Sequence, residues 1–205
     1  MRIRHRVYVP QVDPTAWVAP NAVLSGRVVV GPRSRILYGA VLTAEGRAEL
    51  QVGSDCVVME QAVLRASGRF PLTVGDGTLV GPHAYLSGCT VGPGCFIATG
   101  AMVFNGASLG EGSTVALGGV LHIATAMPRE SWIPIGHIAV GQPGEIFSPD
   151  RSAAIHEKIG STGFPAYVFG LQVEGKRRGE INGEIARRYS RALEAHQHDE
   201  ILPDD

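Results

Sequence analysis

Aliphatic residues recur every six positions over most of the first 125 residues of this 205-residue chain. The series begins at Val18 and reaches Leu121, with one five-residue step after Leu86. A helix would need a period near 3.6 and a half-buried strand a period near 2, whereas six suits short strands joined by turns. Since three such hexads close a triangular coil, the repeat predicts a mainly β protein built as a hexapeptide parallel β-helix.

A second column, made of small residues, supports the same fold. A small residue follows the aliphatic one by four positions at Ala22, Ser34, Ala40, Cys56, Ala62, Thr78, Ala84, Thr90, Cys95, Ala101, Ala107 and Ser113. We expect both columns to point into the coil. Two longer steps, at residues 43–51 and 65–73, interrupt the series. They are predicted to be loops that leave the coil at the same edge.

The pattern changes after Gln142-Pro143, where the hexads stop. We therefore expect a β-helix over residues 1–147 and a C-terminal helical segment, residues 148–205, that packs on it. Within that segment the run STGFPAYVFG is predicted to be a linker between two helices.

Each of the two predicted helices has its own signal. The first begins near Ser148 or Asp150, either of which would cap it, and ends at Gly160. The second covers about residues 176–198, because an apolar residue recurs every fourth position. Its stripe consists of Ile181, Ile185, Tyr189 and Leu193. We expect this stripe to pack on a flank of the β-helix and the final residues, 198–205, to be frayed.

Charge and cysteine usage exclude several classes of protein. The 18 basic and 19 acidic residues give a formal net charge of -1, which offers no field to hold nucleic acid or an anionic membrane. The chain lacks a secretion signal and an apolar run of roughly 18 residues, so we expect a cytoplasmic location. Cys56, Cys89 and Cys95 are odd in number and without CxxC spacing, so they are predicted to be reduced and buried rather than disulfide-bonded or zinc-binding.

Four runs of the chain resemble the gamma-class carbonic anhydrase family: YGAVL, VGSDCVVMEQAVLR, VGDGTLVGPHAYLSGCTVG and FIATGAMVFNGASLGEGSTV. The similarity covers roughly residues 15–146 and includes the five-residue step. The resemblance implies a left-handed β-helix with a C-terminal helix, assembled as a homotrimer. It also implies an active site between subunits, where one subunit supplies two zinc-binding histidines and its neighbour the third.

The positions of those three histidines hold Arg65, Pro82 and Ser87 in this chain. A catalytic zinc ion needs three protein ligands, whereas arginine stays cationic and proline has no side-chain donor. We therefore expect no metal at this site and no carbonic anhydrase activity. At two positions where the family has an acidic residue, this chain also has one, Glu45 and Glu60.

Arg65 itself is the candidate replacement for zinc. We interpret it as a fixed cation for a carboxylate, phosphate or bicarbonate-like anion, with Glu45 nearby, Glu60 as a base and Ser87 as a hydrogen-bond donor. Weaker candidates for substrate binding are Tyr85 and Asn105. The alternative is structural, since an arginine and a glutamate of adjacent subunits would form an ion pair that fastens the trimer.

Two histidines lie near the same positions. His83 is one residue beyond Pro82, so it is either a catalytic residue or a surface or interface histidine packed over Gln61. His122 shares the outward column of Ser87 but is separated from it by Phe104, or roughly 10 Å at the coil spacing. It remains a candidate binding residue.

Three functions are compatible with these residues. The first is a metal-free protein, similar to the gamma carbonic anhydrases, that binds or converts a small anionic metabolite at the trimer interface. The second is a coenzyme A-dependent acyltransferase that uses His83 or His122 as its base; only this alternative needs a cofactor. The third is a non-catalytic trimeric scaffold. The expected partners are a small anionic molecule and two further copies of the chain, without nucleic acid or membrane.

Overall fold

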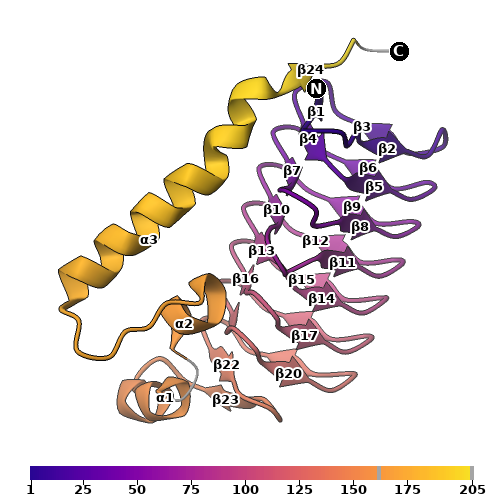
Figure 1. Cartoon of the computed structure of the whole chain (residues 1–205). Coiled ribbons are helices and arrows are strands. Elements are labelled where there is room, and N and C mark those ends of the chain that lie inside the picture. Colours follow the sequence, from indigo (N-terminus) through magenta and orange to yellow (C-terminus); the bar gives the residue numbers. More distant parts are fainter. Residues whose placement is uncertain (161–162, 204–205) are drawn as a thin grey trace.

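The chain forms a left-handed parallel β-helix followed by C-terminal helices, as predicted (Figure 1). The computed structural model describes residues 1–160 and 163–203. Three sheets form the sides of the coil, and the strands of successive coils pair in parallel. Only β23 (Glu145–Phe147) and β24 (Glu200–Ile201), among the described strands, pair antiparallel, at the two ends of the first sheet. Figure 1 shows these coils stacked along one axis, with α3 (Arg178–Leu193) running diagonally beside them.

Within each sheet the strands stack in a fixed order along the axis of the coil. The first sheet contains β24 (Glu200–Ile201), β1 (Arg2–Arg4), β4 (Val23–Gly26), β7 (Val41–Ala44), β10 (Val63–Ala66), β13 (Tyr85–Ser87), β16 (Met102–Val103), β19 (Val120–Leu121), β22 (Ile138–Val140) and β23 (Glu145–Phe147). The second sheet contains β2 (Gln11–Val12), β5 (Val28–Val30), β8 (Leu50–Val52), β11 (Leu72–Val74), β14 (Thr90–Val91), β17 (Ser108–Leu109) and β20 (Ala126–Met127). The third sheet contains β3 (Trp17–Val18), β6 (Arg35–Ile36), β9 (Val57–Val58), β12 (Leu79–Val80), β15 (Phe96–Ile97), β18 (Thr114–Val115) and β21 (Trp132–Ile133).

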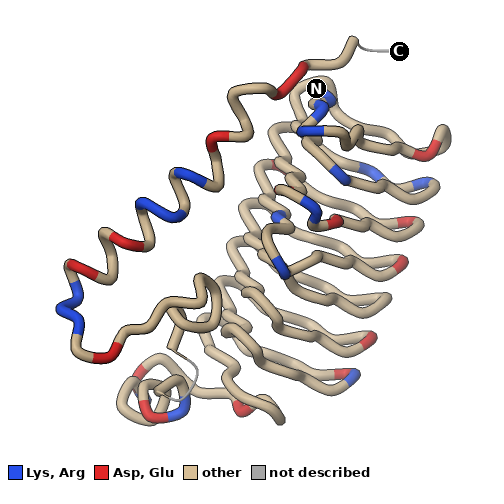
Figure 2. Tube along the Cα trace, in the orientation of Figure 1, with Lys and Arg blue, Asp and Glu red and all other residues tan. Residues whose placement is uncertain are grey.

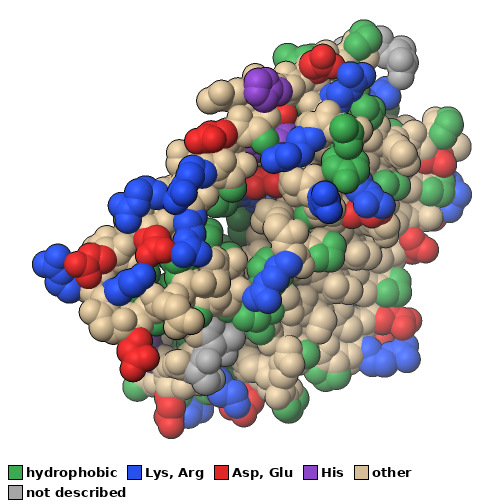
Figure 3. All heavy atoms as spheres, in the orientation of Figure 1, with side chains coloured by type: hydrophobic (Ala, Val, Ile, Leu, Met, Phe, Trp, Pro, Cys, Tyr) green, Lys and Arg blue, Asp and Glu red, His purple; other side chains and the backbone are tan. Residues whose placement is uncertain are grey.

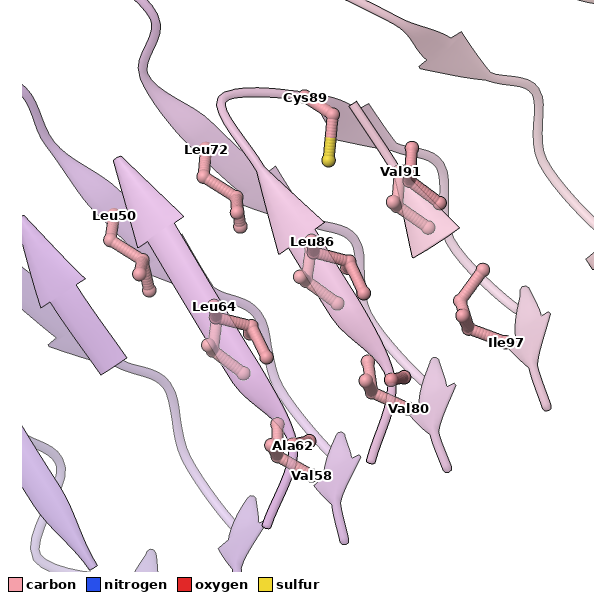
Figure 4. Packing of buried hydrophobic residues seen from close by; sticks show 14 of the residues in the cluster. Leu50, Val58, Ala62, Leu64, Leu72, Val80, Leu86, Cys89, Val91 and Ile97 are labelled. Atoms are coloured by element: carbon pink, nitrogen blue, oxygen red, sulfur yellow. The ribbon is translucent and has the colours of Figure 1, made fainter. Parts of the chain in front are cut away.

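The aliphatic column is the core of the molecule. Leu42, Leu64 and Leu86 are in register on neighbouring strands, and their side chains are fully buried. Figure 4 shows Leu64 and Leu86 side by side inside the coil, facing residues of the other two sheets. The same column continues beyond the predicted end, through Ile133 to Ala139. The repeat therefore fixes the fold along the whole β-helix.

The small-residue column contains one wrong prediction. Thr90 is exposed, and Cys89 occupies the inward position instead, with 1% of its surface exposed. The cause is the five-residue step after Leu86, which brings the inward position one residue earlier. All three cysteines are free and buried, as expected. Burial raises the pKa of the Cys89 thiol to about 12, so this group is an inert part of the core.

The two longer steps are loops at one edge of the coil, as predicted. One joins β7 to β8 and the other joins β10 to β11. Because β7 and β10 are paired neighbours, the loops lie one above the other. The second loop is tightened by an antiparallel bridge between Ser67 and Phe70.

The first C-terminal helix, α1 (Ser152–Ile159), begins later than the sequence suggested. Neither Ser148 nor Asp150 caps it, and Arg151 occupies the N-cap position. Ser148 instead donates its hydroxyl hydrogen to the Asp150 carboxylate, which lowers the pKa of Asp150. The helix ends at Gly160, as predicted.

The predicted linker contains a second helix, α2 (Phe164–Phe169). Pro165 lies in its first turn, where its missing N–H costs nothing, and Gly170 ends it with a left-handed backbone at φ +63°. The first two residues of the predicted linker, 161–162, lie outside the described part of the chain.

The long predicted helix is confirmed as α3, which continues into a 3₁₀ turn, η1 (Glu194–His198). Charged residues of both signs follow its length (Figure 2). Among them, Glu184 pairs with Lys176 at 2.8 Å and with Arg188 at 2.7 Å. The apolar stripe that contains Tyr189 is only half-buried. Within the described residues, no helix is both long enough and apolar enough to span a membrane.

The expectation of a frayed tail is wrong for the residues that the structure describes. β24 pairs antiparallel with β1, in a register that sets Ile201 opposite Ile3. The N–H of Leu202 also donates to the Arg2 carbonyl at 2.8 Å. β1 would otherwise be an edge strand with unpaired backbone groups, and the tail satisfies them. Residues 200–202 therefore lie against the N-terminal strand.

The stacked core gives a first prediction. Leu64→Ala should lower the free energy of unfolding by about 2–5 kcal/mol, because it opens a cavity between two other buried leucines. Thr90→Ala is the matched control at an exposed strand position and should change it by less than about 0.5 kcal/mol. Denaturant unfolding measures both values. Equal losses in the two variants would contradict the assignment of the core column.

Candidate functional site

A cavity of about 310 Å³ lies between the first sheet and the helices α2 and α3. It brings together five residues that were predicted from the sequence: Glu45, Arg65, Tyr85, Ser87 and Asn105. The loop between β10 and β11 and residues of both helices complete its lining. The surface is hollowed between α3 and the coils on this side of the molecule (Figure 3). We call this cavity the Arg65 cleft.

Arg65 and Glu45 form an ion pair within one chain. Arg65 lies on β10 opposite Thr43 of β7, and Glu45 follows the end of β7. Arg65 donates to Glu45 Oε1 from Nε at 2.9 Å and also from Nη2. The guanidinium stacks over the ring of Tyr189 of α3, 5.0 Å from its centroid. A guanidinium carries five N–H donors, so the Arg65 guanidinium can donate hydrogen bonds to a further, anionic partner.

Ser87 and Asn105 form a polar pair beside Arg65. Ser87 is opposite Arg65 in the sheet, and its hydroxyl donates to Asn105 Oδ1 across a long 3.5 Å. Both residues are buried, at 5% and 6% exposure. Gly88 permits this arrangement, since a Cβ there would lie 2.4 Å from the Phe70 Cβ and 2.8 Å from Asn105 Nδ2. Its positive φ of +52° likewise favours glycine.

Aromatic rings form much of the remaining wall. Tyr85 packs against Phe104 with ring centroids 5.9 Å apart. On the helical side, Phe169 of α2 meets Tyr189 of α3 edge-on at 6.1 Å and Phe164 at 5.7 Å. The cleft therefore combines two polar pairs with a largely apolar enclosure, as small-molecule sites commonly do.

The loop between β10 and β11 holds α2 in place over the cleft. Arg69 donates from Nη2 to the Tyr167 carbonyl at 2.6 Å, and its guanidinium lies 5.3 Å from the Tyr167 ring centroid. The same guanidinium is 4.9 Å from the Phe70 ring centroid. The sequence reasoning missed these residues and the aromatic side chains of α2. The signal was present, because the run GFPAYVFG is too rich in aromatic residues for a solvated linker.

Glu60 and His83 do not line the cleft of their own chain. They lie together at another corner of the coil, where the His83 N–H donates to the Glu60 carbonyl at 3.1 Å. His83 is exposed and has a left-handed φ of +56°, typical of a corner residue. The approach of either residue to the cleft of a neighbouring subunit stays a prediction.

His122 is also outside the cleft. It follows β19 and is half-buried, and its Nδ1 is buried with no hydrogen-bond partner among the described residues. Burial lowers the pKa of His122, because charging an enclosed imidazole is unfavourable.

The residues at the three zinc positions of the gamma class do not fit a zinc ion. Arg65 is cationic and already bonded to Glu45, Pro82 has no side-chain donor, and Ser87 offers a neutral hydroxyl. Zinc prefers imidazole, thiolate and carboxylate donors, none of which stands at these positions. No step of the chemistry in this cleft can therefore be assigned to zinc held by these residues.

A larger cavity, of about 940 Å³, lies near the C-terminal end of the coil. Its lining includes Gln142, Glu145, Arg151 and Lys158, and it contains none of the predicted site residues. Lys158 and Glu145 neutralise each other there at 2.7 Å. The Arg65 cleft remains the better candidate because its polar groups converge.

His122 gives a prediction for the effect of pH. Its folded-state pKa lies below the ordinary value of 6.5, so the folded chain holds fewer protons on this residue than the unfolded chain. The free energy of unfolding should therefore fall as the pH decreases through 6.5, and His122→Phe should make that fall smaller.

Denaturant unfolding at pH 7.5 and pH 5.5 measures the difference. His83→Asn is the matched control, since this exposed residue has a backbone that asparagine tolerates. A pH dependence that is unchanged in His122→Phe would contradict the prediction.

Comparison with known proteins confirms the resemblance found in the sequence. No family model matches the chain. The chain is 37% identical over 100 residues to "Gamma carbonic anhydrase 3, mitochondrial" of Arabidopsis thaliana, a match that covers 43% of this chain. The chain spans only 38% of the length of that curated relative.

Two solved structures share the fold. A hexapeptide transferase family protein from Anaplasma phagocytophilum superposes with a TM-score of 0.51 at 19% identity, over 95% of this chain and 96% of the other. A UDP-N-acetylglucosamine acyltransferase superposes with a TM-score of 0.56 at 17% identity, over 89% of this chain and 71% of the other. The chain is thus similar to a gamma-class carbonic anhydrase in sequence and to hexapeptide-repeat transferases in fold.

Proposed function

We propose that the Arg65 cleft binds a small carboxylate with an apolar body, without zinc in the cleft. The observation that carries this proposal is the convergence of the Arg65–Glu45 and Ser87–Asn105 pairs in one cavity with aromatic walls. Arginine suits a carboxylate because its planar fork can form two parallel hydrogen bonds. The cavity volume of about 310 Å³ limits the ligand to a small molecule.

Each group has a distinct role in the proposed complex. Arg65 binds the carboxylate, and the Glu45 ion pair and the Tyr189 ring keep its guanidinium in place. Asn105 supplies a further donor through its amide group, Ser87 can turn its hydroxyl from Asn105 to the ligand, and Glu45 is placed to accept a proton from the bound molecule. Because Glu45 already neutralises part of the charge on Arg65, affinity should be modest and depend on the apolar body of the ligand.

The homotrimer and the cytoplasmic location remain parts of the proposal. Exposed aromatic side chains on one side of the coil support association, among them Trp17 at 42%, Phe96 at 46% and Trp132 at 61% exposure. These three residues belong to strands of the third sheet. In a trimer, Glu60 or His83 of a neighbouring chain is the proposed additional acid or base at the cleft.

The activities that the names of the similar proteins imply do not match the residues of the Arg65 cleft. Acyl transfer in this cleft would need a histidine base, and neither His83 nor His122 of the same chain lines it, so the base would have to come from a neighbouring chain. Zinc-dependent carbon dioxide hydration would need ligands that Arg65, Pro82 and Ser87 do not provide. The comparisons therefore support the β-helix fold, whereas the residues of the Arg65 cleft support a binding function that differs from those of the similar proteins.

Ligand binding tests the proposal. Calorimetric titrations with benzoate, butyrate, phosphate and acetyl-coenzyme A should show binding of benzoate or butyrate. Arg65→Met with Glu45→Gln should weaken it by about tenfold or more, because a hydrogen bond to a charged group contributes about 1.5–3 kcal/mol.

The matched control replaces an exposed ion pair on another corner, with Arg33→Met and Asp55→Asn, and should bind as the wild type does. Binding of acetyl-coenzyme A alone would favour the acyltransferase function. Absence of any binding would favour the scaffold.

A second test concerns carbonic anhydrase activity. The Arg65 cleft should not accelerate carbon dioxide hydration, with or without added zinc, since no zinc-bound water with a pKa near 7 can form there. Any hydration by the wild type should therefore be unchanged in Ser87→Ala. A stopped-flow hydration assay measures this. Zinc-dependent hydration that is abolished by Ser87→Ala would contradict the absence of zinc from the cleft.

A further inference from the structure

Three side chains of the kinds that bind transition metals lie where the C-terminal segment meets the N-terminal strand. His5, His196 and Asp199 each offer a ligand atom, and these atoms lie within 4.8 Å of one another. Nδ1 of His5 is 2.7 Å from Asp199 Oδ1, and Nδ1 of His196 is 2.7 Å from Asp199 Oδ2. The carboxylate therefore faces both imidazoles.

Backbone hydrogen bonds hold the three residues in place from both ends of the chain. His5 lies directly after β1 and exchanges hydrogen bonds with Tyr8 at 3.0 and 3.1 Å. His196 belongs to η1 and Asp199 ends it, immediately before β24 pairs with β1. Figure 1 shows β24 beside β1 and the N-terminus. The three side chains are therefore held close together by the fold itself, and no flexible loop has to become ordered before a ligand can bind.

Burial separates this cluster from an ordinary surface ion pair. His5 is 2% exposed, while Asp199 and His196 expose 18% and 35% of their side chains. The two imidazole rings face each other, with centroids 4.4 Å apart and planes 31° from parallel. The cluster therefore holds its imidazole and carboxylate donors close together in a mostly enclosed position.

We propose that His5, His196 and Asp199 bind a divalent transition metal ion, with zinc as the expected occupant. Two imidazoles and one carboxylate are three protein ligands, which leave a fourth tetrahedral position for water. With bonds of about 2.0–2.1 Å, tetrahedral ligand atoms lie about 3.3 Å apart, so the cluster needs only small side-chain movements to close around the ion.

Binding changes the protonation of the cluster. The metal takes the nitrogen lone pairs that face Asp199, so each neutral ring carries its remaining proton on Nε2. The ion would also join β24 and η1 to the N-terminal strand, and with them the C-terminal end of α3.

This site is separate from the three positions at which the gamma class binds zinc, since none of its residues is Arg65, Pro82 or Ser87. Its test is therefore independent of the function proposed for the Arg65 cleft. The sequence reasoning missed it because His5 and Asp199 are 194 positions apart.

Cobalt and zinc titrations of the full chain, after removal of bound metal by chelation, test the proposal. We expect one Co²⁺ per chain, with the intense visible absorption of a tetrahedral complex, and a rise in Tm on addition of Zn²⁺. His196→Asn and Asp199→Asn should each weaken binding by about tenfold or more and remove the rise in Tm.

Two features keep the experiment decisive. His196 and Asp199 are only partly buried, so their variants avoid the cavity that replacement of the buried His5 would create. His198→Asn, an exposed histidine on the same turn, is the matched control and should bind as the wild type does. The proposal would be overturned if the wild type bound no stoichiometric metal, or if the cluster variants bound metal as well as the wild type does. His5, His196 and Asp199 would then be a hydrogen-bonded cluster that joins the two ends of the fold without metal.

Discussion

Burial of the stacked aliphatic column is the interaction on which the rest of the structure depends. Leu42, Leu64 and Leu86 occupy the same position on successive strands, so each coil covers the apolar face of the next. Shifting a strand by one residue would expose this column and bury its polar neighbours. The column thereby also fixes the outward positions, and this is why Arg65 and Ser87 lie side by side at the cleft.

The sequence predicted the features that follow from this periodicity and missed those that depend on contacts between distant segments. The sheets, both loops and the grouping of Arg65 with Ser87 follow from counting in sixes. Thr90 was misplaced because the five-residue step moves the inward position to Cys89. The folded tail was missed because pairing of β24 with β1 leaves no local signal, and the role of α2 was missed because glycine and proline suggested a linker.

The proposed function would give this scaffold a chemistry different from that of the gamma class. At the positions that the resemblance matches to the zinc histidines, this chain has an organic cation, Arg65, a proline without a side-chain donor, Pro82, and a neutral donor, Ser87. An arginine keeps positive charge at the site but cannot activate water as zinc does, so the change favours binding of an anion over hydration chemistry. The Arg65–Glu45 pair and the aromatic walls then limit which anions bind favourably. A small, strongly hydrated ion would lose its hydration on entering the cleft and would bury no apolar surface in return.

A crystal structure of the chain grown with benzoate tests the central claim most directly. The carboxylate should lie within hydrogen-bonding distance of the Arg65 guanidinium, and Tyr85, Tyr189 and the α2 side chains should enclose the aromatic ring. The Arg65–Glu45 pair should be intact or rearranged around the ligand. A structure in which residues of a neighbouring subunit fill the cleft, or in which benzoate binds elsewhere and leaves the cleft to water, would contradict it.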